Sequence, residues 1–347
     1  MFKRITLFLS LIFVLQSGFA QDISFSQRFV SSPYLNPALT GIFNGTVRIG
    51  AQYRDQWNSP LDASFQTYAA SGDLKYNLNL FKQTSDDILG IGIQFVNDRV
   101  EGIDFNTSLI GLSAAFHKSL NPRKQHFLGF GMQLGVIQKN VNYEQLIFAD
   151  QYNNVDDYSF PTAEPVPTNN FAIADLSLGI LYLISPSKSF SLRAGLAFHH
   201  ISTPNLSFFR FNEDYDKNDI LPKITFHTTA SFKTGAFTHL MPRFIIHTQG
   251  PFVDMELGSN IKFTTFNRDF LTFHLGLSTH IVKDLGTIGM ASVVPFVGFQ
   301  LNNVLVGVSY DVGINTLLHN QRNFSTLEFS VSYLGEYDNQ PVFCPKF

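Results

Sequence analysis

Apolar and polar residues alternate with a period of two along most of this chain after residue 20, and such alternation predicts β-strands rather than helices. The clearest run lies between residues 253 and 263. One side of this run carries the apolar residues Val253, Met255, Leu257, Ile261 and Phe263. The other side carries the polar or glycine residues Asp254, Glu256, Gly258, Asn260 and Lys262. Similar alternation recurs in 190–199, 271–281, 304–312 and 326–333. Helical periodicity is scarce, so the sequence predicts an all-β fold.

Fourteen segments are predicted strands, each bounded by turn-forming residues such as Gly, Asn, Pro or Asp. They are 44–56, 62–76, 87–98, 104–118, 125–139, 171–183, 188–201, 222–234, 241–249, 252–265, 269–281, 290–301, 303–314 and 324–335. These segments are longer than the ~5–6 residues typical of soluble strands. An even number of long antiparallel strands is typical of single-chain bacterial barrels. We therefore predict a transmembrane antiparallel outer-membrane β-barrel over 44–335, with 14 strands.

The polar faces of these strands favour a water-filled lumen over the outer surface of a soluble β-sandwich. They consist mainly of Gly, Ser, Thr and Asn with scattered charges. Charged residues make up only 15% of the chain, against about 25% in an ordinary soluble domain. Aromatic residues reach 14%, with 37 Phe and 12 Tyr. A lipid-facing outer surface accounts for both departures, because it accepts Phe and Tyr and excludes charge.

The lengths of the connections agree with this topology. With the N-terminus in the periplasm, each connection from an odd to an even strand lies outside the cell. The two longest gaps, 140–170 and 202–221, both fall in that class, as the long loops of outer-membrane barrels do. Both gaps are acidic. The charges of 140–170 are typical of a solvated surface, with a contact to a partner or cation as the alternative, whereas 202–221 lacks the fixed Gly and terminal Glu of an EF-hand calcium loop. The gap 77–86 is rather long for a periplasmic turn.

Residues 1–20 are a predicted signal peptide, with Lys3 and Arg4 before an apolar run and small residues before Gln21. The apolar run from 5 to 15 is too short to span a bilayer as a helix. We therefore expect export to the outer membrane. Removal of the two basic residues takes the formal charge from −3 to −5, and so there is no basic surplus for nucleic acid.

Residues 21–43 form an irregular segment that does not resemble a strand. Pro33 and Pro37 interrupt it, yet it is too apolar for a loose tail. Its apolar residues are Phe25, Phe29, Val30, Tyr34, Leu35, Leu39, Ile42 and Phe43. We predict that it packs into or beneath the barrel as a plug or a periplasmic docking segment, with Phe25, Tyr34, Asn36, Pro37 and Gly41 as candidate contact residues. Residues 336–347 are expected to be a periplasmic C-terminal tail.

The first predicted strand carries a second candidate site. Arg48, Gln52, Arg54 and Gln56 share its polar face, and so we expect them on the lumen wall. They could bind a partner or substrate. The favoured alternative is that the two arginines pair with lumen carboxylates such as Asp254, Glu256 or Glu328, because an uncompensated buried charge is costly. Trp57 follows at the expected outer aromatic girdle.

The sequence contains no local signature of an enzyme or a cofactor site. No G-x-S-x-G nucleophile motif and no glycine-rich phosphate loop occurs. His199 and His200 are adjacent on a predicted strand, so we expect them on opposite faces and unable to share a metal. The single cysteine, Cys344, cannot form an internal disulfide. We predict no catalytic residue, no cofactor and no metal.

A set of motifs in a fixed order resembles the PorP/SprF family. They are QDISFSQRFVSSPYLNPALTG directly after the signal, YRDQW, FQTYAAS at 65–71, VGVSYDVGIN, TLEFSVSYLG and the CPKF tail. The resemblance covers essentially the whole mature chain and is weakest through 140–250.

This resemblance implies an outer-membrane barrel of the type IX secretion system of Bacteroidota. Members of the family support the secretion or surface attachment of proteins with a C-terminal sorting domain, including gliding adhesins. The implied partners are such a secreted protein, other type IX components on the periplasmic side, and outer-membrane lipid.

A fatty-acid-transporter-like or porin-like channel for small molecules is the alternative function. Fatty-acid-transporter barrels also carry Asn-Pro-Ala near the N-terminus, as this chain does at 36–38. An apolar uptake channel needs a continuous apolar path, whereas the predicted lumen faces are polar and glycine-rich. The sequence therefore favours the secretion function.

Overall fold

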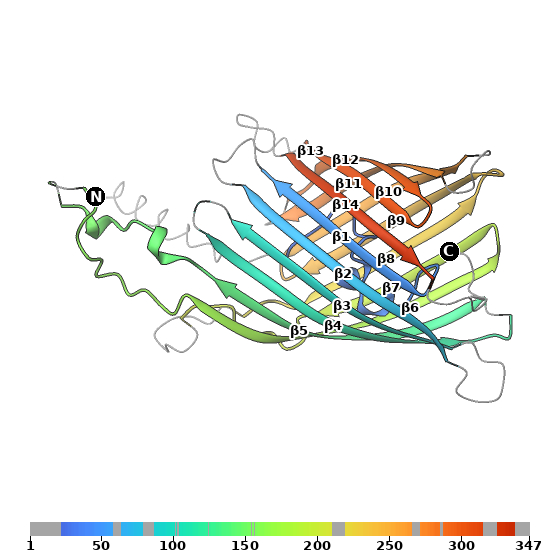
Figure 1. Ribbon diagram of the computed structural model, residues 1–347, viewed down its shortest axis with the longest axis horizontal. Coiled ribbons are helices and arrows are strands. Elements are labelled where there is room, and N and C mark those ends of the chain that lie inside the picture. Colours follow the sequence, from blue (N-terminus) through green and yellow to red (C-terminus); the bar gives the residue numbers. More distant parts are fainter. Residues whose placement is uncertain are drawn as a thin grey trace, which may run out of the picture.

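The protein is a closed antiparallel barrel in which every strand pairs with its neighbours in sequence and β1 pairs with β14 (Figure 1). The computed structural model describes residues 22–57, 64–78, 87–100, 102, 104–123, 125–153, 155, 157–209, 219–265, 271–284, 287–314 and 325–336. The strands are β1 (Val47–Gln56), β2 (Phe65–Leu78), β3 (Asp87–Val100), β4 (Phe105–Ser119), β5 (His126–Asn140), β6 (Asn170–Ser187), β7 (Phe190–His199), β8 (Lys223–Lys233), β9 (Thr238–Gln249), β10 (Phe252–Thr264), β11 (Leu271–Asp284), β12 (Thr287–Leu301), β13 (Val304–Gly313) and β14 (Ser325–Gly335). The predicted fold class is confirmed.

Several strand ends differ from the sequence-based prediction. β1 begins at Val47 instead of residue 44. Just before it, Gly45 has a φ of 114°, outside the range of a strand, and a Cβ added there would lie 2.5 Å from the Gly335 carbonyl oxygen. β9 begins at Thr238 instead of 241. β11 and β12 form one long hairpin joined by 285–286, where the sequence predicted a wider gap. The predicted signal peptide and the tail from 337 onward lie outside the described residues, as does 79–86 of the expected turn.

Two prolines within strands interrupt pairing on one side only. Pro242 of β9 pairs in register with Ser259 of β10, whereas the β8–β9 ladder is interrupted next to it. Pro295 of β12 faces Leu277 of β11, whereas the β12–β13 ladder skips this position. Proline has no amide N–H to donate, so each strand keeps one intact neighbour and loses pairing with the other.

The two faces of the wall have opposite character, as expected for a barrel in a bilayer. On β5, Phe130, Met132 and Leu134 are exposed on the outer face. Gly131 and Gln133, between them, point inward and are buried. The inner face is mainly polar and glycine-rich, as expected, but it also has one apolar region formed by Ile88, Phe127, Leu181 and Leu183.

The two ends of the barrel differ in their connections. The connections 141–169 and 200–222 lie at one end, here the long-loop end, and both follow odd-numbered strands as predicted. The connection 141–169 contains the short helices η2 (Tyr143–Gln145) and η3 (Ala149–Gln151). Two-residue turns at 188–189 and 302–303 lie at the opposite, short-turn end. Within the described ranges, no helix has the length and apolarity needed to cross a bilayer.

Candidate functional site: a segment anchored across the lumen

Residues 22–43, here the lumen segment, cross the inside of the barrel from the long-loop end to the short-turn end. At its start, Asp22 accepts hydrogen bonds from His200, just beyond β7, and from Lys223 of β8. At its other end, the Phe43 carbonyl accepts a hydrogen bond of 2.7 Å from Lys75, near the end of β2. The chain then enters β1 at the short-turn end.

Two short helices give the lumen segment its local structure. Pro33 lies in the first turn of α2 (Ser32–Leu35), and Pro37 begins η1 (Pro37–Leu39). A proline is tolerated at these positions because the first amide groups of a helix have no partner within the helix. Asn36 joins the two helices and caps η1, since its Oδ1 accepts the Ala38 amide at 2.8 Å. The prolines that interrupted the strand pattern are thus helix starts.

A row of small residues on the barrel wall makes room for these helices. It runs across five neighbouring strands in direct register: Gly90, Ala115, Gly131, Gly179 and Ala197. The lumen segment lies so close that a Cβ atom added at Gly131 would overlap the backbone of Ala38. A Cβ at Gly179 would overlap Oδ1 of Asn36, and one at Gly90 would overlap the Thr40 carbonyl. The polar-face glycines of the sequence pattern are therefore a contact surface.

Asn36 connects the lumen segment to three strands at once. Its side chain is fully buried. The Nδ2 group lies within hydrogen-bond distance of the carbonyls of Ile180 and Leu196, at 3.2 and 3.4 Å. It also lies 3.0 Å from Nε2 of His227 on β8, which accepts when that nitrogen is unprotonated. An asparagine is suited to this position, because its amide both donates to the wall and accepts from η1.

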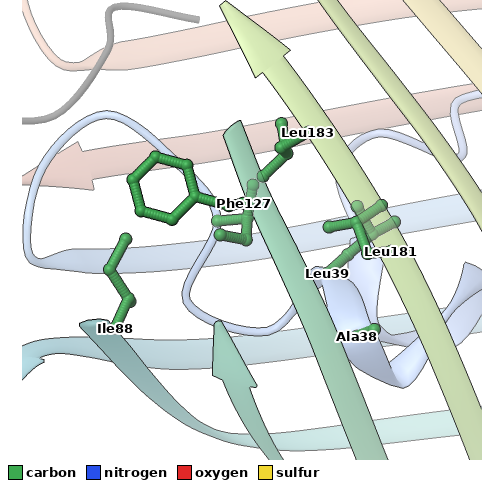
Figure 2. Packing of buried hydrophobic residues seen from close by; sticks show 7 residues of the cluster. Ala38, Leu39, Ile88, Phe127, Leu181 and Leu183 are labelled. Atoms are coloured by element: carbon green, nitrogen blue, oxygen red, sulfur yellow. The ribbon is translucent and has the colours of Figure 1, made fainter. Parts of the chain in front are cut away.

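Apolar contacts hold the segment beyond Asn36. Leu39 and Ile42 are buried against the apolar region of the inner wall. Figure 2 shows Ala38 and Leu39 beside side chains that come from β3, β5 and β6: Ile88, Phe127, Leu181 and Leu183. Nearer the long-loop end, Phe25 packs edge-on against Tyr34, with ring centroids 5.8 Å apart. Burial of such side chains is worth roughly 1.5–3 kcal/mol each.

The two arginines of β1 pair with carboxylates directly opposite on the neighbouring strands. Arg48 lies 2.7 Å from Asp73, its register partner on β2. Arg54 lies 3.7 Å from Glu328, its register partner on β14. Glu328 was among the carboxylates expected from the sequence. The expected pairing with lumen carboxylates is therefore confirmed for both arginines. The partner of Arg48 is Asp73 and not one of the three carboxylates given as examples, because Asp73 faces Arg48 directly and β10 is far from β1 around the barrel.

The same carboxylates also hold the lumen segment. Asp73 accepts the Gly41 amide at 2.8 Å, where Gly41 has a φ of 78°. Glu328 accepts the amides of Ser26 and Gln27 at 2.9 and 2.8 Å. Each of these buried carboxylates therefore has both a cationic partner on the wall and backbone donors from the segment, which is the condition under which a buried charge is tolerated.

Arg28 reverses the arrangement, because here the lumen segment supplies the cation. Its guanidinium lies 2.8 Å from Asp254 and 3.2 Å from Glu256, both on β10. Glu256 also pairs with Arg243 of β9. Although burial opposes the charged form of Arg28, the two carboxylates raise its pKa. Sequence reasoning missed Arg28, and its only signal was a basic residue in an otherwise apolar segment.

Asp22 anchors the start of the segment in a small ionic cluster. The two ring nitrogens of His200 lie 2.8 Å from Asp22 and 3.0 Å from Asp175, and Lys223 lies 2.6 Å from Asp22. Burial alone would lower the pKa of His200, but the carboxylates of Asp22 and Asp175 raise it to about 9. Burial would likewise raise the pKa of Asp22, but Lys223 and His200 hold it well below its usual range.

The structure also corrects the expected placement of the two adjacent histidines. Strand β7 ends at His199 and the backbone of His200 has a φ of 57°. Both side chains are consequently buried, with ring centroids 6.4 Å apart, and do not lie on opposite faces of one strand. No group of three or more His, Cys, Asp or Glu side chains suited to a metal ion occurs among the residues that the structure describes.

The other predicted lumen-wall residues lie on the inner side of β1. Gln52 is buried. Gln56 accepts a hydrogen bond of 3.3 Å from Arg54. The structure brings both arginines of β1 together with the lumen segment. Asp73, the partner of Arg48, had no distinguishing mark in the sequence. A register calculation for β1 and β2 would have revealed it.

The model of a protein family described as "Type IX secretion system membrane protein PorP/SprF" matches residues 17–333. The chain belongs to the PorP/SprF family. The resemblance seen in the sequence is thereby confirmed, and this PorP/SprF protein is a type IX secretion system membrane protein with an outer-membrane barrel fold. No curated protein matches its sequence.

Solved structures of outer-membrane barrels are similar to this PorP/SprF protein in fold. A deltaS2 mutant of the TodX monoaromatic hydrocarbon channel aligns with a TM-score of 0.51 and 10% identity, covering 89% of this chain and 94% of the channel. The Ralstonia pickettii toluene transporter TbuX also aligns with a TM-score of 0.51 and 10% identity, covering 92% and 95% of the two chains. At such low identity the likeness concerns the fold alone.

Proposed function

We propose that this protein is a non-enzymatic component of the outer membrane that supports the secretion or surface attachment of a protein with a C-terminal sorting domain, such as a gliding adhesin. Membership of the PorP/SprF family supports the link to type IX secretion. The partners in this proposal are the secreted protein and other type IX components on the periplasmic side.

The observation that carries this proposal is the anchored lumen segment. It is tied to the wall by an ionic cluster at Asp22, by a hydrogen bond from Lys75 to the Phe43 carbonyl at its other end, and by Asn36 between them. A general diffusion pore needs an open water path, and a buried, multiply bonded segment opposes one. A barrel of this kind is better suited to present fixed surfaces to other proteins at its two ends.

A channel for small molecules is the second candidate, because two cavities flank the lumen segment. One, of about 210 Å³, lies towards the long-loop end and is lined by Asp22, Phe25 and Phe252 among others. The other, of about 270 Å³, extends to Phe43 and Leu334 near the short-turn end. Arg28 and Leu35 of the lumen segment line both cavities, so the segment lies between them.

Two experiments distinguish these functions. Deletion of the gene is expected to remove one or a few sorting-domain proteins from the surface proteome, and complementation with the wild-type gene should restore them. An unchanged surface proteome contradicts the secretion function. In planar bilayers the purified protein is expected to conduct poorly, and large steady currents from the wild-type protein would favour a pore.

A further inference from the structure

The cavity on the short-turn side of the lumen segment is unusually rich in arginine. Four arginines line this space of about 270 Å³, together with His227 and His274, while no described residue of its lining is Asp or Glu. The arginines are Arg28, Arg48, Arg193 and Arg243. The only formal charges in this lining are positive. Whether the cavity attracts an anion therefore depends on how many of its arginines already pair with a carboxylate behind the lining.

Three of these arginines are already neutralised by carboxylates behind the lining. Arg28 pairs with Asp254 and Glu256. Arg48 pairs with Asp73, and Arg243 pairs with Glu256 at 2.5 Å. Their charges are therefore largely compensated before any ligand arrives.

Arg193 is different, because it has no hydrogen bond or ion pair with any residue in the described part of the chain. It lies on β7, on the same inward face as Gly195, where a Cβ would meet the side chains of Asn36 and His227. Arg193 is only partly exposed, so water solvates its guanidinium incompletely. A half-buried cation without a counter-charge is costly, and an anionic ligand would relieve that cost.

The register places a second set of polar groups beside Arg193. Thr229 of β8 is its direct partner, and Arg243 of β9 is the direct partner of Thr229. All three residues line the cavity. Two strand spacings separate the two arginine backbones by roughly 10 Å. A ligand bound by Arg193 therefore also has a hydroxyl group within reach on the neighbouring strand.

Apolar side chains also line the cavity, and several of them come from the lumen segment. They include Phe29, Leu39 and Ile42, with Phe296 of β12 packed edge-on against Phe29 at a centroid distance of 5.5 Å. Phe29 remains 36% exposed inside the protein. The cavity thus combines Arg193, which has no counter-charge among the described residues, with the accessible apolar surface of Phe29, and this combination suits a ligand with both characters.

We infer that this cavity binds a carboxylate group carried on an apolar group, with Arg193 as its principal partner. A single uncompensated guanidinium matches one negative charge, and its planar fork matches a carboxylate. Asn44 and Leu334 line the cavity near the short-turn end, so the ligand would enter from the periplasmic side. The inference goes beyond the proposed function, because the site would exist whether or not the protein handles a sorting-domain client.

Two sources supply this chemistry, and binding to the purified full chain in lipid nanodiscs distinguishes them. The first probe is octanoate, with octanol as its uncharged counterpart. The second is N-acetyl-leucyl-phenylalanine, with the C-terminal amide as its uncharged counterpart. Isothermal titration calorimetry, corrected with empty nanodiscs, is expected to show at least one acid binding roughly tenfold or more tightly than its neutral counterpart, since hydrogen bonds to charged groups are the stronger ones.

The variants test the assignment to Arg193. Arg193→Gln is expected to abolish the preference for the acid, while Arg99→Gln, which removes an exposed arginine paired with Asp104 at the long-loop end, should retain it. Without ligand, Arg193→Gln should melt at the same or a higher temperature, because it removes an uncompensated charge. Binding of octanoate alone would indicate a free acid, and binding of the peptide alone a polypeptide C-terminus. The inference is overturned if neither acid binds, if acids and neutral compounds bind equally, or if Arg193→Gln keeps the preference.

Discussion

Substitution of Gly179 by alanine should release the lumen segment without disturbing the barrel. The added Cβ would overlap Oδ1 of Asn36, which lies directly above this strand. To avoid the overlap, Asn36 must move away from the wall and give up its contacts with Ile180, Leu196 and His227 and its bond to the Ala38 amide. The wall itself is unaffected, because alanine is accepted in a β-strand at least as well as glycine.

The size of the effect follows from these contacts. Four hydrogen bonds at a net 0.5–1.5 kcal/mol each amount to about 2–6 kcal/mol. A loss of about 2 kcal/mol raises the population of the undocked segment roughly thirtyfold. Hydrogen–deuterium exchange measured by mass spectrometry reports this directly, since the amides of Ala38, Leu39 and Thr40 are all bonded within the docked segment.

A matched control is available on the inner face of β5. Alanine at Gly135 would lie 3.5 Å from its nearest neighbour, the Ile110 carbonyl, which is an ordinary contact. Gly135→Ala should therefore exchange like the wild type, while Gly179→Ala exchanges at least thirtyfold faster in the peptide containing η1. Equal protection in both variants, with both barrels folded, would refute the view that small inward residues position the segment.

Three further predictions concern the ionic anchors and the segment as a whole. Asp73→Asn should lower the free energy of unfolding by about 3 kcal/mol, because it leaves the buried guanidinium of Arg48 uncompensated. Asp104→Asn, in the exposed pair with Arg99, should lower it by less than about 1 kcal/mol. Equal losses for the two variants in denaturant titrations would contradict this. Because the pKa of His200 rises to about 9 on folding, its contribution is complete below pH 6.5 and disappears as pH rises past 9. The melting temperatures of wild type and His200→Gln should therefore converge at high pH, and a pH-independent difference would argue against the anchor at Asp22. Deletion of 22–41 behind an intact signal should leave a heat-modifiable, membrane-inserted barrel that no longer supports client display, and normal display would reduce the segment to a leader.

The alternation of residue types was sufficient to predict the barrel. On β5 and β10, successive side chains alternate between an apolar face that suits the bilayer and a face that suits the filled lumen. Such a sheet must close into a barrel, because an open edge would leave backbone N–H and C=O groups unpaired in lipid. Strand ends were less predictable. Pro242 and Pro295 both lie within strands, and each is accommodated by a local gap in the pairing with one neighbouring strand.

The sequence by itself determined the fold class, the strand count and the oddity of residues 22–43, because these depend on local periodicity and composition. Only the tertiary structure decided the partners. Arg48 meets Asp73 because two strands pair in one register, and Arg28 meets Asp254 because the segment crosses the lumen. Arg193 is distinguished by having no charged partner within the described ranges. Pairing across a closed barrel depends on register and closure, which no local pattern encodes.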